Sequence, residues 1–313
     1  MSIIFGPIPS RRLGRSIGIN NIPPKICSYS CVYCQLGVTN NMSIQREEFY
    51  SSDVIYEELS LKISELQKHG EHIDYLTFVP DGEPTLDINL GAMIDRFKSF
   101  GLKIAVISNA SLIWNLKVQN ELLQADWVSL KVDSVLEKVW KKVNRPHGFL
   151  NLQRIIDGAV AFSKKYKGVL ATETMLVGGI NDNPESLNLT AETIRRINPQ
   201  IAYILVPTRP PAENIAVKPS EESLITAYNI FSSKIKNVEV ISGNEGTDFS
   251  FSSDVEKEIV NILSVHPMRE DAVEEFLTKS NNDWNTVEEL IQKEIIKKTL
   301  YSGEVFYSKN FNK

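Results

Sequence analysis

Three cysteines carry the clearest chemical signal in this sequence, because they are its only cysteines and lie close together. Cys27, Cys31 and Cys34 form a C-x₃-C-x₂-C arrangement. Three cysteines cannot form a complete set of disulfides, so their crowding in one loop indicates a metal site. Thiolates on a tight loop can hold three irons of a [4Fe–4S] cluster and leave its fourth iron without a protein ligand.

Zinc is the alternative metal for this loop. A structural zinc site takes four protein ligands, so a histidine would have to complete the set. The sequence has four histidines, none of them at ligand-like spacing: His69, His72, His147 and His266. Three cysteines that are buried by chance are a weaker alternative, because all three fall within one short segment. We therefore favour the iron–sulfur cluster.

The residue before the third cysteine, Tyr33, completes a pattern that resembles the radical S-adenosylmethionine (SAM) superfamily. In that family the open iron binds the amino nitrogen and carboxylate oxygen of SAM, and the reduced cluster cleaves SAM to a 5′-deoxyadenosyl radical. The segments SRRLGRS, CSYSCVYCQLG and DGEPTL look like an uncharacterised branch, loosely related to wyosine-type tRNA modification enzymes. The resemblance covers roughly residues 5–245.

The resemblance implies a function and a set of partners. It implies an enzyme that uses one [4Fe–4S] cluster and SAM to abstract hydrogen from an unidentified substrate, with RNA or a protein/peptide expected. It also implies an electron donor such as a flavodoxin or ferredoxin. No cysteine remains for a second cluster, which argues against the auxiliary-cluster branches. The alternative is a non-catalytic iron–sulfur-binding winged-helix regulator. No side chain is singled out as catalytic.

Short β-rich apolar runs alternate with stretches of helical period after the cysteines, a pattern typical of repeated βα units. We expect strands at 15–20, 73–79, 102–107, 126–131, 168–176, 200–206 and 238–242. We expect helices at 53–68, 88–100, 112–124, 135–143, 151–166, 184–196 and 220–236. These elements predict an α/β fold, a partial (β/α)6 TIM-like barrel that is open rather than closed.

Polar residues and glycines follow the carboxyl ends of these strands, where barrel enzymes build their sites. The resemblance assigns Glu83 to the ammonium group of SAM, and Gly82 would allow close backbone approach. Asp81 departs from the family pattern, which has a glycine there. The other positions assigned to the cofactor are Tyr33, Ser108, Asn109, Lys131, Gly178 and Gly179. Plain turns remain the alternative for the Asp-Gly, Asn and Gly-Gly segments, and pairing with Asp133 for Lys131.

Arginines stand on two proline-containing segments, residues 6–16 and 207–211. Arg11, Arg12 and Arg209 could present a cationic surface to a carboxylate- or phosphate-bearing substrate over the barrel mouth. The alternative is that they pair with surface acids and pack through their aliphatic stems.

The chain changes character after residue 248, which divides it into a barrel domain at 1–248 and a second domain at 249–313. Helices are expected at 254–265, 268–278 and 284–292, followed by two β-like runs around Ser302 and Gly303. This order suggests a small winged-helix-like domain. It contains 12 acidic and 8 basic residues from position 254 onward, the reverse of what phosphate binding needs. We expect it to brace the barrel or recognise protein rather than RNA.

Composition sets the remaining bounds. A net charge of −5 and 42% hydrophobic residues are typical of a soluble globular protein. No segment approaches the roughly 18 apolar residues of a membrane helix, and the first residues lack a signal-peptide pattern. We therefore expect a cytoplasmic protein without a membrane partner.

Overall fold

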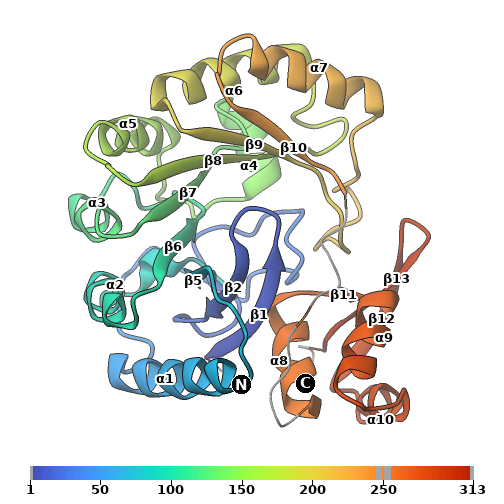
Figure 1. Cartoon of the computed structure of the whole chain (residues 1–313). Helices are drawn as coiled ribbons and strands as arrows, with labels where there is room; N and C mark the ends of the chain where they lie inside the picture. The colour runs from blue at the N-terminus through green and yellow to red at the C-terminus, as the bar shows by residue number, and fades with distance from the viewer. Residues whose placement is uncertain (1–2, 244–248, 250–254, 311–313) are drawn as a thin grey trace.

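An eight-stranded sheet forms the centre of the computed structural model, which describes residues 3–243, 249 and 255–310 (Figure 1). The strands, in their order across the sheet, are β1 (Ile4–Ser10), β2 (Gly14–Ile19), β5 (Tyr75–Phe78), β6 (Lys103–Ser108), β7 (Trp127–Lys131), β8 (Val169–Met175), β9 (Ile201–Leu205) and β10 (Val238–Ile241). Neighbours from β2 to β10 pair in parallel, whereas β1 pairs with β2 antiparallel. The predicted α/β fold with a mostly parallel sheet is confirmed.

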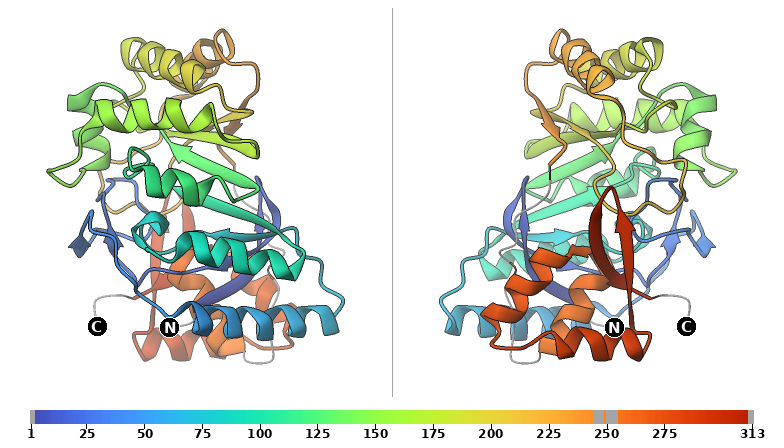
Figure 2. Two further views of the ribbon diagram at one scale, coloured as in Figure 1. Left: turned by 90° about the vertical axis from the view of Figure 1, so that its left-hand side faces the viewer. Right: turned by 90° about the vertical axis from the view of Figure 1, so that its right-hand side faces the viewer.

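Helices connect the parallel strands and cover the outer face of the curved sheet (Figures 1 and 2). They are α1 (Ser52–Lys68), α2 (Leu90–Phe97), α3 (Leu116–Leu122), α4 (Glu137–Asn144), α5 (Leu152–Ser163), α6 (Pro184–Ile197) and α7 (Glu221–Ser232). The sequence of α1 shows why such a segment forms a helix that packs on the sheet. Ser51 caps its first turn, and Ile55, Leu59 and Leu66 recur at helical spacing on one buried face.

The N-terminal segment differs from its prediction. Residues 6–16, in which no strand is expected before position 15, form most of the hairpin of β1 and β2. Pro7 and Pro9 obscure the strand because proline cannot donate to a ladder. Both are tolerated here because β1 lies at the edge of the sheet and the pairing is irregular between Phe5 and Ile8.

The C-terminal unit contains three helices and a small antiparallel sheet. Its elements are α8 (Val255–Val265), β11 (Met268–Arg269), α9 (Glu270–Lys279), α10 (Asn285–Gln292), β12 (Ile296–Tyr301) and β13 (Glu304–Lys309). The sheet order is β11-β13-β12, so the expected helices and hairpin are present and β11 is an additional strand. Residue 248, on which the expected domain boundary falls, lies outside the described residues.

The C-terminal unit packs against β1 and α1 of the barrel. Ile8 of β1 packs against the hydrophobic core of the unit, and α8 lies beside β1 (Figure 1). Lys62 of α1 and Glu258 of α8 form a buried ion pair, with 2.8 Å between Nζ and Oε2. None of the helices within the described part of the chain is long and apolar enough to cross a membrane.

Candidate active site

The cysteines lie in a loop that follows β2 and is tied to the end of α4. β3 (Ile26–Cys27) pairs with β4 (Asn41–Met42) at the base of the loop. The backbone N–H groups of Ser30 and Val32, on either side of Cys31, donate to the carbonyls of Asn144 and Val143. These bonds fix the loop at the carboxyl edge of the parallel strands.

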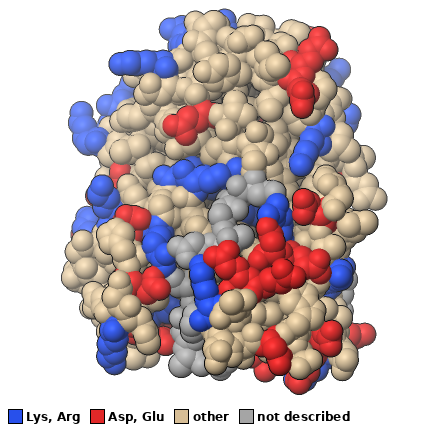
Figure 3. Space-filling model, turned by 45° about the vertical axis from the view of Figure 1, so that its right-hand side comes forward, with Lys and Arg blue, Asp and Glu red and all other residues tan. Residues whose placement is uncertain are grey.

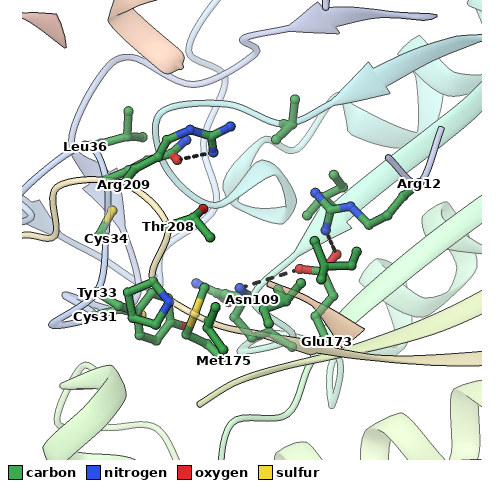
Figure 4. Close-up of a pocket in the computed structure, with 18 of the residues that line it drawn as sticks. Arg12, Cys31, Tyr33, Cys34, Leu36, Asn109, Glu173, Met175, Thr208 and Arg209 are labelled. Carbon is green, nitrogen blue, oxygen red and sulfur yellow. Dashed lines mark hydrogen bonds and ion pairs between the residues drawn. The ribbon is translucent and has the colours of Figure 1, made fainter. Parts of the chain in front are cut away.

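All three cysteines line one cavity of about 290 Å³ (Figure 4). Residues at the ends of five successive strands line it as well: Gly82 after β5, Asn109 after β6, Lys131 on β7, Met175 on β8 and Thr208 after β9. Residues separated by more than a hundred positions thus meet where parallel strands end, as the predicted barrel requires.

The thiol environment fits an iron–sulfur cluster. Burial raises the pKa of all three thiols, that of Cys31 to about 12, so binding iron must displace their protons. The cations Lys25 and Lys131 oppose this effect at Cys34. Among residues 3–243, 249 and 255–310, no three His, Cys, Asp or Glu side chains converge to hold a single metal ion. A cubane needs no such convergence, because each thiolate binds a different iron.

Glu83 lies beneath the cavity and is absent from its lining. The side chain is 0% exposed, and its carboxylate accepts hydrogen bonds from Thr85, Ser108 and the backbone N–H of Asn109. Ser108 is likewise buried below the surface of the cavity. Since its oxygens already serve interior donors, Glu83 supports Asn109, which does line the cavity.

Glycine is required at position 82 because the cysteine loop passes very close to it. A Cβ there would lie 1.8 Å from the carbonyl oxygen of Ile26. The group that approaches Gly82 closely is therefore the backbone of the protein's own cysteine loop. Gly82 also lines the cavity.

Gly178 and Gly179 are not brought to the cavity. The Gly178 N–H donates to Val217, and a Cβ at Gly178 would lie 2.7 Å from the carbonyl oxygen of Lys218. Gly179 is exposed in a left-handed conformation, with φ of 71°. Both glycines lie in a turn in the structure, and their assignment to the cofactor stays a prediction.

The wall of the cavity contains a buried acidic side chain that the sequence did not single out. Glu173 of β8 is 2% exposed; it pairs with Arg12, accepts from Ser129 at 2.8 Å and lies 3.6 Å from Lys131 Nζ. Burial would raise the pKa of Glu173, but the cations Arg12 and Lys131 lower it overall. Lys131 thus forms its ion pair with Glu173, and it also interacts electrostatically with Asp133, the partner named in the alternative. The sequence feature that could have pointed to Glu173 is an acidic residue within an otherwise uncharged strand, β8.

The three candidate substrate arginines all line the cavity. Figure 4 shows Arg12 with Glu173 on one side, and Arg209 near Leu36 and Cys34 on the other. Arg209 donates from Nη1 to Gln35 Oε1 at 2.8 Å and contacts His266 Nε2 from Nη2 at 3.0 Å. Arg11 donates to the carbonyl of Gly243, beyond β10.

Tyr33 reaches a buried polar network that the sequence did not predict. Its hydroxyl donates to Asp133, which is 4% exposed, and Lys131 Nζ lies 5.2 Å from the centre of its ring. Asn144 donates from Nδ2 to Asp133 at 2.6 Å and to Cys31 Sγ at 3.5 Å. Asn144 closes α4, and nothing in the sequence distinguishes it from an ordinary residue at a helix end.

Comparison with known proteins places the chain in a family. The family model for the radical SAM superfamily matches residues 21–194. A UPF0026 protein of Methanocaldococcus jannaschii is 47% identical over 312 residues, which is 99% of this chain and 97% of the relative. A UPF0026 protein of Helicobacter pylori is 33% identical over 234 residues, 74% of each chain.

A solved structure shows the same fold at low identity. The radical SAM methyltransferase from Sphaerobacter thermophilus has a TM-score of 0.53 and 14% identity, and the match covers 73% of this chain and 66% of that one. Members of the radical SAM superfamily use a [4Fe–4S] cluster and SAM. Because the family model spans more than half of the chain and includes all three cysteines, this protein is an enzyme of the radical SAM superfamily.

Proposed function

We propose that the chain holds one [4Fe–4S] cluster through Cys27, Cys31 and Cys34 and uses it, with SAM, to abstract hydrogen from a substrate in the same cavity. When bound, the cluster and SAM would supply a 5′-deoxyadenosyl radical. The observation that carries this proposal is the meeting of three thiols with five parallel strand ends around one cavity. The regulator alternative is not favoured, because the chain belongs to a family of enzymes.

The lining residues would bind and orient SAM. Asn109 lines the cavity beside the cluster loop, and Lys131 presents an ammonium group that suits oxygen atoms of the cofactor. Tyr33 covers part of the wall with its ring, and Gly82 brings backbone close to the cluster loop. Glu83 keeps Asn109 in place from below.

The substrate would bind between Arg12 and Arg209, beside the cluster. A neighbouring cavity of about 120 Å³ shares Arg12, Gln35 and Arg209 with the first and extends to Val265 and His266 of the C-terminal unit. Guanidinium groups suit a carboxylate or phosphate on the substrate. RNA and a protein or peptide are both candidates, and a flavodoxin or ferredoxin is the candidate electron donor.

The C-terminal unit is proposed to be winged-helix-like, with β12 and β13 as the wing. The order α8-β11-α9-α10-β12-β13 supports this assignment. Figure 3 shows acidic side chains gathered on the lower half of one face, where the unit lies, and this charge disfavours phosphate binding. Bracing the cavity through Val265 and His266, or protein recognition, fits the unit better than RNA binding.

Production of 5′-deoxyadenosine tests the proposed function. Protein reconstituted anaerobically with iron and sulfide, reduced with dithionite and mixed with SAM is expected to release it. Cys31→Ser protein should bind less iron and release none, because one thiolate ligand is lost. The same wild-type sample loaded with zinc is the matched control and should be inactive. Wild-type protein that binds four irons and releases no 5′-deoxyadenosine would contradict the proposal.

A further inference from the structure

Two asparagine side chains donate to the sulfurs of two of the three cysteines. Asn109 Nδ2 lies 3.4 Å from Cys27 Sγ, and Asn144 Nδ2 lies 3.5 Å from Cys31 Sγ. Both distances suit N–H···S hydrogen bonds, because sulfur is a larger acceptor than oxygen. The two donors come from different elements, the end of β6 and the end of α4.

The orientation of the Asn109 amide is fixed by its other partners. Its Oδ1 accepts from the backbone N–H of Ser111 at 2.9 Å, and a backbone N–H can only donate. The nitrogen must therefore face Cys27 and Ser28, and the Ser28 hydroxyl accepts at 2.9 Å. Glu83 holds the backbone N–H of Asn109 at 2.7 Å, so the donor is fixed at both ends.

The Asn144 amide is fixed by a carboxylate. Asn144 is 1% exposed, and its Nδ2 lies 2.6 Å from Asp133 Oδ2, an acceptor that cannot face the amide oxygen when ionised. Asp133 is itself held by the backbone N–H of Met175 at 2.8 Å and by the Tyr33 hydroxyl. One amide hydrogen serves Asp133, which leaves the other for Cys31 Sγ and the Tyr33 oxygen.

Hydrogen-bond donors held at these two sulfurs would change the reduction potential of the cluster. Reduction adds negative charge that is shared with the sulfur ligands, and N–H···S hydrogen bonds stabilise that charge. We propose that Asn109 and Asn144 are positioning residues that raise the reduction potential of the cluster by donating to Cys27 and Cys31. This inference rests on the proposed function, since it requires the cluster.

Redox titration of leucine variants tests the inference. Asn109→Leu and Asn144→Leu keep the approximate side-chain volume and remove the donors. Each should make cluster reduction at least tenfold less favourable, which lowers the midpoint potential by 59 mV for one electron. Asn21→Leu is the matched control: Asn21 is 0% exposed and donates to Pro84 and Asp87, but contacts no cysteine sulfur. Its midpoint should equal that of the wild type.

The outcomes separate this inference from the proposed function. The inference would be overturned if cluster-loaded Asn109→Leu and Asn144→Leu proteins had the same midpoint potential as Asn21→Leu. This holds even if their melting temperatures fall. The predicted shift in a protein that releases no 5′-deoxyadenosine would support it and overturn only the proposed function. Wild-type protein that takes up no cluster would overturn both.

A measurement on the wild-type chain decides the matter if the variants fail to load a cluster. Protein labelled with ¹⁵N only at asparagine is reconstituted and reduced without SAM, so that no cofactor nitrogen is present. Pulsed electron paramagnetic resonance should then show ¹⁵N coupled to the cluster spin through the hydrogen bonds. A spectrum without asparagine ¹⁵N coupling would overturn the inference.

Discussion

Glu83 serves the cavity from inside the protein. Burial raises its pKa, and the hydrogen bonds from Thr85, Asn109 and Ser108 oppose this effect by stabilising the charged form. Its position after β5 is the place where the family resemblance puts an acid next to the cofactor. In this chain the acid accepts a hydrogen bond from the backbone N–H of Asn109 and so helps to orient that residue, while its contact with the cofactor stays a prediction.

Asp81 makes the stability of the protein depend on pH. Burial raises the pKa of its carboxyl to about 7, well above the ordinary range of aspartate, although Asn20 donates to one of its oxygens and opposes the shift. The folded chain therefore binds more protons than the unfolded chain between about pH 4 and pH 7. The contribution of Asp81 to stability is thus lost as pH rises through this range, by on the order of 4 kcal/mol.

Asp81→Asn should remove this dependence. The slope of unfolding free energy against pH, measured by urea denaturation of the metal-free protein from pH 4 to pH 8, should become flatter in the variant. Asp182→Asn is the control, because Asp182 accepts one hydrogen bond from Gly179 in an exposed turn. Parallel slopes for wild type and Asp81→Asn would refute the prediction.

Some residues of the site could be predicted from the sequence and others could not, and the difference has a physical reason. Cys27, Cys31 and Cys34 share one loop, and Asn109 and Lys131 end strands, so local patterns suffice to find them. Glu173 reaches the site through contacts that include Arg12, 161 positions away, and Asn144 through contacts that include Cys31, 113 positions away. Such contacts depend on how α4 and β8 pack, which local periodicity does not encode.

At the scale of elements, α1 and α8 are joined by the Lys62–Glu258 pair, whose side chains are 10% and 7% exposed. Lys62→Met should lower the unfolding free energy by about 3 kcal/mol, because it removes the cation from a buried carboxylate. Lys62→Met combined with Glu258→Met should recover most of that loss. Thermal denaturation checks both variants.

Lys141→Met is the control. It breaks the exposed pair with Glu137 on α4 and should lower the unfolding free energy by less than about 1 kcal/mol. Equal losses at Lys62 and Lys141 would contradict the prediction.

The order of strands and helices was predictable because each βα unit repeats the same two periods. β1 was missed because Pro7 and Pro9 interrupt its pattern, and its pairing with β2 depends on an edge that only the assembled sheet provides. β11 spans two residues and gains its partner from β13, which follows it by more than thirty positions. Short strands of this kind leave no periodic signal.

At the scale of the whole molecule, Gln35 joins the cysteine loop to the C-terminal unit. Its Nε2 donates to the carbonyl of Val265 at 2.9 Å, and its Oε1 accepts from Arg209. Gln35→Leu removes both bonds and should speed hydrogen exchange at the end of α8 by about fivefold, since one such bond contributes about 1 kcal/mol.

Mass spectrometry of deuterated peptides would measure this exchange. Gln153→Leu is the control, because Gln153 bonds only to Asp157 within α5 among its described contacts. It should leave exchange in α8 at the wild-type rate. Unchanged exchange at the end of α8 in Gln35→Leu would contradict the prediction, because it would mean that the Gln35 bonds add no stability there.

Ile8 belongs to the first strand of the chain, yet it packs into a core built from residues after position 248. A ribosome makes that strand long before it makes the residues that the strand packs against. This edge of the barrel therefore stays incompletely covered until the C-terminal unit has been synthesised.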